Sequence, residues 1–216
     1  MDSAVTPGPK APTFTGTARR AQIVAAAIET IAEVGYGQAS LVRIAERIGI
    51  SKGVIVYHFD SKEDLVKEVI REVLAKAAEY MVPRITAATG GQEKLRAYIE
   101  SNLGFMAEHR SYMIAIAEIA RGARDQSGHR PFDASSLEAG TAALAALLAN
   151  FQASGEFRPD FNPRVMAEAI RAAIDAVPRR LAAQPDLDVD LYRRELAELF
   201  DLATRSRDSR RRSPAR

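Results

Sequence analysis

The chain has 216 residues, 47% of them hydrophobic, which is enough to bury a proper core in one large domain or two small ones. It has no cysteine, which excludes disulfides, thiolate metal sites and cysteine nucleophiles. Its three histidines, His58, His109 and His129, do not pair at ligand spacing, so no metal or other cofactor is expected. No apolar run approaches the roughly 20 residues that span a bilayer, and the sequence therefore predicts a cytoplasmic protein without membrane contact.

The two ends of the chain differ in composition from everything between them. Residues 1–16 combine proline, glycine, serine and threonine without periodicity and are expected to form a flexible arm. Residues 205–216 hold six arginines and one aspartate, a local charge of +5 in a chain whose net charge is +2. The basic balance therefore comes from this tail, which is typical of a solvated, disordered end. Auxiliary contact of the tail with phosphates is the alternative.

Apolar residues recur at helical spacing through most of the chain. In the amino-terminal third this spacing predicts a helix that closes at Gly35, as a carboxy-terminal glycine should. Ser40 and Ser51 stand where two further short helices need their amino-terminal caps. The predicted helices of this part span residues 18–35, 41–48 and 51–57.

A fourth helix is predicted to begin at the capping-box-like pair of Ser61 and Asp64 and to stop ahead of Pro83. Residues 111–120 are apolar on nearly every side, which indicates a helix buried at the centre of a bundle. No segment has the alternation of a strand, so the fold is expected to be all-α with about nine helices. The other predicted helices span residues 95–106, 135–153, 163–183 and 189–204, with a mobile loop at 122–134.

The second and third helices form a predicted helix-turn-helix. They are short, and Ile48-Gly49-Ile50 joins them. The glycine suits a tight turn that needs a positive φ, and the apolar residues beside it pin both helices against the first one. The third helix can then lie in the major groove of DNA, with its amino-terminal residues first.

The stretch from Arg19 to Leu65 resembles the amino-terminal domain of the TetR family of transcriptional regulators. So many residue types stand at the family's spacings that chance agreement is remote. The resemblance implies a DNA-binding domain over residues 17–77 and an effector-binding and dimerisation domain over residues 78–204. It is carried by Ile23, Ala26-Ala27, Gly35-Tyr36, Ser40, Ile44-Ala45, Gly49, Ser51-Lys52-Gly53, Tyr57-His58-Phe59, Lys62-Glu63 and Leu65.

Two stretches depart from the family pattern. Leu41-Val42-Arg43 leaves no small polar residue beside Ser40. Val54-Ile55-Val56 gives the third helix an unusually β-branched core. The base preference of this chain is therefore not transferable from any relative.

The residues expected at the DNA lie at helix starts and on the third helix. Hydroxyl and backbone N–H groups at helix starts can receive phosphate oxygens, arginine can hold guanine bidentately, and valine can pack on a thymine methyl. The predicted set is Ser40, Arg43, Ser51, Lys52, Gly53, Val54, Tyr57, His58 and Lys62.

Within this set the candidates for base edges are Arg43, Lys52, Gly53 and Val54, and the others are assigned to phosphates. Two members have a structural alternative. Tyr57 could pack the core of the amino-terminal domain, which is the role expected for Phe59. Arg43 could be a solvated helix charge.

One helix-turn-helix domain offers too few contacts for sequence specificity, so a homodimer is expected. It would read a palindromic operator on double-stranded DNA whose half-sites lie one helical turn or a multiple apart. In the family, the last two helices pack against those of a second copy as a four-helix bundle. The resemblance places this interface at Ile170, Ile174, Val177, Leu196, Leu199 and Phe200. A core within one chain explains the same apolar stripes.

The resemblance also implies a small-molecule effector of open identity, bound between the fourth helix and the bundle that follows. Polar residues within apolar stretches could orient it, and apolar neighbours could form walls. Each candidate also has a plainer role, in core packing or in an ion pair between residues three apart on a helix. The candidates are Asn102, Phe105, Met106, His109, Tyr112, Met113, Glu118 and Arg121.

Together these patterns predict a sequence-specific DNA-binding transcriptional regulator. Its simplest form is a repressor released by a small, mostly apolar effector through a shift between two shapes. An activator, or a DNA binder without ligand switching, keeps the same head. An enzyme is the rival from another class, but the sequence has no phosphate loop, nucleophile elbow, metal cluster or paired carboxylates. A protein-interaction module leaves the head motif unexplained.

Overall fold

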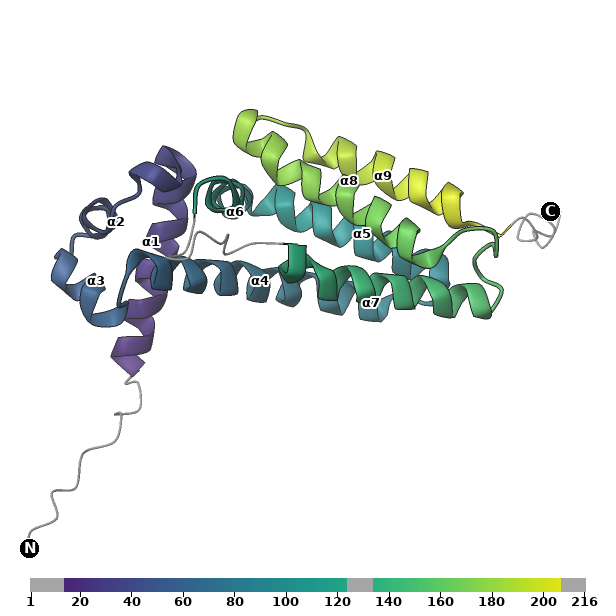
Figure 1. Cartoon of the computed structure of the whole chain (residues 1–216), viewed down its shortest axis with the longest axis horizontal. Helices are drawn as coiled ribbons and strands as arrows, with labels where there is room; N and C mark the ends of the chain where they lie inside the picture. The colour runs from purple at the N-terminus through teal and green to yellow at the C-terminus, as the bar shows by residue number, and fades with distance from the viewer. Residues whose placement is uncertain (1–13, 124–133, 207–216) are drawn as a thin grey trace, which may run out of the picture.

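The structure, a computed structural model, describes residues 14–123 and 134–206 (Figure 1). Within these residues it contains nine α-helices and no strand, apart from an isolated bridge between Phe157 and Arg205. The all-α prediction is therefore confirmed. Most of the predicted arm, loop and arginine-rich tail lies outside the described residues.

Three helices form the head, at the left of Figure 1: α1 (Phe14–Gln38), α2 (Leu41–Arg47) and α3 (Lys52–His58). Gly35 breaks α1 with a φ of 77°, which glycine adopts without strain, so the predicted helix end is confirmed. Gly49 turns the chain between α2 and α3 with a φ of 66°. Helix α1 begins at Phe14, inside the predicted arm, because no proline follows Pro12 to interrupt it.

Helix α4 (Lys62–Ala87) runs from the head along the body, so it links the two parts (Figure 1). Its predicted cap is confirmed, because the Ser61 hydroxyl accepts from the backbone N–H of Asp64 at 3.1 Å. The prediction that Pro83 ends the helix is wrong. Pro83 and Glu79 are exposed, so water can hydrate the Glu79 carbonyl that the proline leaves without a donor.

The body is a bundle in which α5 packs against α4 and α9, and α7 packs against α8. The Asn162 side chain caps α8 by accepting from the backbone N–H groups of Arg164 and Val165. Buried residues of the body and the head join in one continuous core. The body helices are α5 (Gly90–Glu108), α7 (Ala134–Ala153), α8 (Pro163–Ala183) and α9 (Val189–Thr204).

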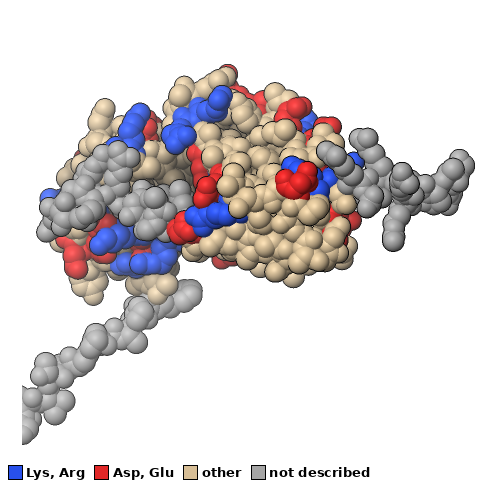
Figure 2. All heavy atoms as spheres, turned by 45° about the vertical axis from the view of Figure 1, so that its right-hand side comes forward, with Lys and Arg blue, Asp and Glu red and all other residues tan. Residues whose placement is uncertain are grey.

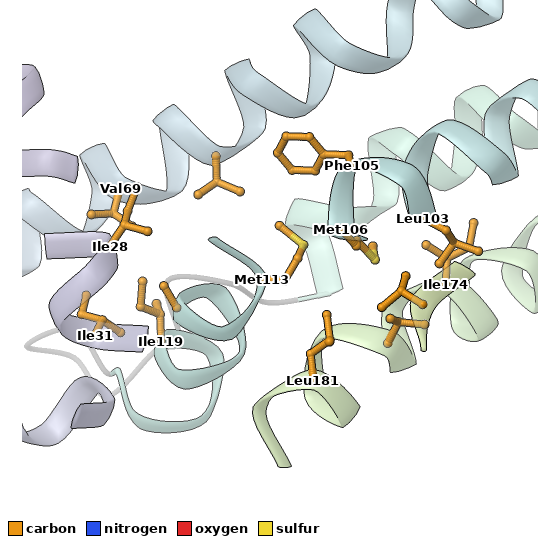
Figure 3. Packing of buried hydrophobic residues seen from close by; sticks show 14 of the residues in the cluster. Ile28, Ile31, Val69, Leu103, Phe105, Met106, Met113, Ile119, Ile174 and Leu181 are labelled. Atoms are coloured by element: carbon orange, nitrogen blue, oxygen red, sulfur yellow. The ribbon is translucent and has the colours of Figure 1, made fainter. Parts of the chain in front are cut away.

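Helix α6 (Arg110–Gly122) lies crosswise between the head and the body, where it packs on α1 and α8 (Figure 1). Figure 3 shows its Ile119 beside Ile28 and Ile31 of α1. The prediction that this helix occupies the centre of a bundle is wrong. Only alternate positions from Met113 to Ile119 are fully buried, because α6 packs on α1 and on α8 while its carboxy-terminal residues Arg121 and Gly122 are exposed.

The buried face of α8 should carry much of the stability of the body. We expect Ile174→Ala to lower the free energy of unfolding by about 3 kcal/mol, because it opens a cavity at a fully buried position. Urea denaturation at a fixed protein concentration measures the change. Val82→Ala is the control, since Val82 is exposed on α4 and should change stability by less than about 0.5 kcal/mol.

Candidate functional site

The surface of α3 separates into an outward and an inward side. Tyr57 is 85% exposed, and Lys52 and Gly53 are exposed beside it. Ile55 and Phe59 are buried under the helix, so the predicted core role of Phe59 is confirmed. The alternative in which Tyr57 packs the core is wrong. The outward side is therefore free to meet a partner.

The two serines predicted at helix starts behave differently. The Ser40 hydroxyl accepts from the backbone N–H of Arg43 at 3.2 Å and so caps α2. Ser51 is the cap residue of α3, but its side chain makes no capping hydrogen bond and is exposed. The Ser51 hydroxyl is therefore available to an acceptor outside the chain.

Three other predicted DNA-binding residues lie on α2 and α3. Arg43 is exposed on α2, with its Nη1 3.5 Å from Oε1 of Gln38. Val54 and His58 are half-buried, and the His58 ring lies edge-on to the Tyr57 ring at 5.1 Å between centroids. Val54 and His58 thus lie on α3 itself, whereas Arg43 lies on α2 beside residues of α1.

The Lys62 ammonium, predicted to bind a phosphate, already has partners within the head. Its Nζ donates to the Tyr36 carbonyl at 2.6 Å and lies 4.1 Å above the Tyr36 ring. Burial lowers the pKa of Lys62, and the charge of Glu63 acts in the opposite direction. One of the three ammonium hydrogens is thus used inside the head, which leaves two for a phosphate.

Arg20, which the sequence analysis did not single out, fixes the position of α3. Its Nη1 donates to the His58 carbonyl at 2.6 Å, and its Nη2 lies 3.1 Å from Oε2 of Glu68 on α4. Its guanidinium also stacks 4.1 Å above the ring of Phe59. The sequence does contain a signal, since position 20 lies on the same face of α1 as the buried Ile23 and Val24.

The predicted effector residues do not converge on one place. Phe105, His109 and Tyr112 form an aromatic cluster with Tyr80 of α4, with 4.5 Å between the Phe105 and His109 ring centroids and 5.4 Å between those of His109 and Tyr112. The Tyr80 ring lies 5.9 Å from that of Phe105. Met106 and Met113 are buried in the core, which is their plainer role (Figure 3).

Asn102 belongs to a second, polar cluster between α5 and α8. Its Nδ2 donates to the Tyr98 carbonyl at 2.8 Å, and its Oδ1 lies 3.4 Å from Nη1 of Arg171. Arg171 also donates to the Tyr98 hydroxyl at 3.0 Å and pairs with Asp175. Burial raises the pKa of Asp175, and Arg171 opposes that shift. The sequence analysis missed this pair, although a charged pair four apart beside the core position Ile174 is a recognisable signal.

Glu118 and Arg121 form the third group, on α6. Arg121 Nη2 lies 2.6 Å from both carboxylate oxygens of Glu118. Their predicted alternative role as an ion pair is therefore confirmed.

Most of the predicted dimer-interface residues are buried within their own chain. Ile170, Ile174 and Val177 are fully buried, and Phe200 is nearly so. For these four the interface prediction is wrong and the intramolecular core explains the stripes, because the buried faces of α8 and α9 turn toward α5, α6 and α7. Leu196 is half-buried and Leu199 is 55% exposed. The apolar residues exposed on these helices include Val165, Leu191, Leu199 and Leu202.

Across residues 14–123 and 134–206, no group of histidine and carboxylate side chains is arranged to hold a metal ion. None of the described helices is long and apolar enough to cross a membrane.

Residues 23–69 match the family model of the bacterial regulatory proteins of the tetR family. The chain is 34% identical over 85 residues to the HTH-type transcriptional regulator BetI 1 of Chromohalobacter salexigens, a segment that covers 39% of this chain and 42% of that relative. The chain spans less than half the length of the curated relatives it matches. The predicted resemblance is confirmed over residues 23–69, which match the amino-terminal domain of that family.

Solved structures share the fold over most of the chain. The fatty acid degradation regulator FadR from Bacillus halodurans aligns with a TM-score of 0.74 at 22% identity, over 90% of this chain and 97% of that one. FadR from Bacillus subtilis, solved in complex with stearoyl-CoA, aligns with a TM-score of 0.71 at 24% identity, over 83% and 96%. The similarity of fold therefore extends through the body as well as the head.

The Arg20–Glu68 contact should stabilise the head in a pH-dependent way. Burial raises the pKa of Glu68, but hydrogen bonds from Arg20 and Arg71 outweigh it and hold the pKa below its usual range. The contribution is therefore present above the ordinary glutamate pKa and is lost as the pH falls through the lowered value. We expect Glu68→Gln to cost about 1–2 kcal/mol of unfolding free energy at neutral pH and nothing in strong acid.

Urea denaturation of both proteins across the acid range measures this difference. Glu79→Gln is the matched control, because Glu79 is an exposed α4 residue that pairs only with the exposed Lys76 among the described residues. A pH-independent difference for Glu68→Gln would show that the lost charge is not the cause.

Proposed function

We propose that this chain is a sequence-specific DNA-binding transcriptional regulator that acts on DNA in the cytoplasm as a homodimer. Its simplest form is a repressor that binds a palindromic operator and is released by a small, mostly apolar effector. The observation that carries the proposal is the outward side of α3, with Tyr57 85% exposed, on a head of the tetR family. No catalytic role is proposed for any residue.

The DNA contacts follow from the position of each side chain on the head. With α3 in the major groove, the exposed Lys52 and Gly53 at its first turn come closest to base edges. Val54 follows them as a candidate for a thymine methyl. The predicted phosphate ligands are Ser40, Ser51, Tyr57, His58 and Lys62, and Arg43 reaches DNA from α2.

The outward faces of α8 and α9 support pairing with a second copy. Val165 on α8, and Leu199 and Leu202 on α9, are more than half exposed in the single chain. Leu191 of α9 is also exposed. On α8 the exposed Ala169 and Ala172 follow Val165 at helical spacing and so lie on the same face of that helix. Two such outward faces of α8 and α9 can form a four-helix interface, which takes the place of the one predicted at the buried positions. Charged side chains are also sparse over much of the body surface that Figure 2 shows.

Release by an effector requires that the ligand prefer a shape of the body that does not bind DNA. Helix α6 supports this mechanism, because it packs on α1 of the head and on α8 of the body. The FadR structure solved with stearoyl-CoA supports a ligand for the body, since it shares this fold. A constitutive DNA binder with the same head is the second candidate, and a screen for compounds that release the operator separates the two.

Lys52 and Tyr57 should be required for DNA binding but not for folding. Selection from genomic fragments supplies the operator, and fluorescence anisotropy at several salt concentrations gives the affinity. We expect Tyr57→Ala to weaken binding by about tenfold or more. We expect Lys52→Gln to weaken binding and to relax the preference at the base pair that Lys52 contacts. Both variants should unfold like the unmodified chain, because both side chains are exposed.

Lys76→Gln is the matched control, because Lys76 is an exposed lysine farther along α4 that pairs with Glu79. If Tyr57→Ala and Lys76→Gln bind the operator equally well, α3 is not the reading surface. If no fragment is enriched with or without cell extract, the proposed function fails.

Leu199 and Leu202 should hold the homodimer together. We expect Leu199→Asp with Leu202→Asp to convert the dimer to monomers, because two charges would enter an apolar interface. Sedimentation velocity measures the change. Leu74→Asp with Val82→Asp is the matched control, since these two α4 residues are equally exposed. A dimer that persists in the α9 variant but dissociates in the α4 variant would move the interface to α4.

A further inference from the structure

A groove of about 350 Å³ lies between α6 and α8, apart from the aromatic and polar clusters of the body. Three of its lining residues are charged and three are alanines. The lining residues are Ala117, Glu118, Ala120, Arg121, Arg179 and Ala182. The groove thus combines a net positive charge with a short apolar floor.

Arg179 is the least satisfied of the charged residues. It is exposed on α8, and within the described part of the chain its charge acts on Asp175, four residues earlier, without a hydrogen bond or a close ion pair. A guanidinium has five N–H donors in a planar fork that matches a carboxylate or phosphate. Its neighbour Arg180 differs, because it donates to the Tyr192 hydroxyl at 3.0 Å.

Arg121 faces the same groove from α6. Its Nη2 is held 2.6 Å from both oxygens of Glu118, whose side chain is only 12% exposed. The buried carboxylate therefore orients the guanidinium, while the Nη1 and Nε hydrogens of Arg121 have no acceptor among the described residues. Two guanidinium groups with free donors then line one groove, and a single anionic group can bridge them.

The floor of the groove limits the rest of the ligand. Ala117 and Ala120 from α6 and Ala182 from α8 have the smallest apolar side chains that a helix can offer without glycine. They leave room for an aliphatic segment and provide it with no hydrogen-bonding group. A ligand with one charged end and a short aliphatic part matches both halves of the groove.

We propose that this groove binds an aliphatic anion, a carboxylate or a phosphate ester, whose charged end lies between Arg121 and Arg179 and whose chain lies on the three alanines. The site deepens the proposed function, on which its regulatory meaning rests, because it assigns an anionic class of effector. Binding itself does not depend on DNA.

The groove also borders the head. Glu118 Oε2 lies 3.0 Å from the point that a Cβ on Gly35 would occupy, and Gly35 is where α1 breaks before the helix-turn-helix. An anion that draws Arg121 toward Arg179 changes the ion pair that holds this carboxylate. Occupation of the groove therefore acts on a carboxylate that lies next to Gly35, from which the chain leads into α2 and α3.

Isothermal titration of the full chain, without DNA, tests the site with three probes that share one alkyl chain: octanoate, octyl phosphate and neutral octanol. We expect at least one anion to bind and octanol to bind at least about tenfold more weakly. The better of the two anions identifies the headgroup. Arg179→Gln should weaken the anion by about tenfold, because it removes one of the two guanidinium groups that bind the charged end, and the exposed position of Arg179 leaves the fold unchanged.

Arg180→Gln is the matched control, since it removes the same charge from the next residue of α8 and should leave the affinity unchanged. Ala182→Leu fills the floor and should weaken both anions while leaving the circular dichroism spectrum unchanged. The proposal is overturned by equal affinity in Arg179→Gln and the unmodified chain, by octanol binding as tightly as the anions, or by no saturable binding of either anion up to about 1 mM. These titrations need no operator, so the groove can bind the anion even if the chain proves not to bind DNA. The proposed function and the anion site are therefore tested by separate results.

Discussion

The seven-residue helix α3 depends on contacts from outside itself, and the rest of the head is arranged to supply them. An isolated helix of this length is unstable in water, because the cost of nucleation is not recovered over two turns. The buried Ile55 and Phe59 pack its inner side onto the core. Arg20 donates to the carbonyl of His58, the last residue of α3, stacks on the Phe59 ring and pairs with Glu68 of α4. The partly desolvated cation of Arg20 needs the Glu68 carboxylate, so α4 is tied to α1 and α3 at one point.

The same logic applies at the junction between head and body. The Ser111 hydroxyl donates to Glu29 Oε1 at 2.7 Å, and the Tyr36 ring lies 3.0 Å from where a Cβ on Gly122 would be. Tyr36 in turn accepts from Lys62 through its carbonyl. Both ends of α6 are thus attached to α1, and a displacement of α6 has to move α1 or break these contacts. Packed interfaces of this kind change between discrete arrangements rather than deform continuously.

The parts of the fold that local chemistry determines could be predicted from the sequence. Ser40 and Ser61 were identified as caps because capping needs one side-chain oxygen a few residues from its partner. The break at Gly35 follows from backbone freedom alone. These features depend on sequence neighbours, so no tertiary structure was needed to find them.

The parts that depend on distant contacts could not be predicted in this way. Helical periodicity identifies an apolar stripe but not what covers it, and so Ile170 and Ile174 were assigned to an interface although they are buried in their own chain. The position of α6 between α1 and α8, and the partners of Arg20, also depend on residues far along the sequence. In the candidate site, the outward positions of α3 could be predicted, because helical spacing alone separates them from the buried Ile55 and Phe59. The predicted effector residues instead lie in three separate groups, because their positions depend on how the body helices pack.

The Arg171–Asp175 pair bears on how the body could change shape. Burying two charges costs solvation energy that their attraction recovers only in part, and the raised pKa of Asp175 shows that part of this cost remains. An apolar pair at these positions would stabilise the packing of α5 on α8 more simply. A charged pair instead fixes the register of the two helices through directed bonds to Tyr98 and Asn102. Directed bonds of this kind hold the two helices in one register, so a shift of α8 against α5 has to exchange them for others rather than slide continuously.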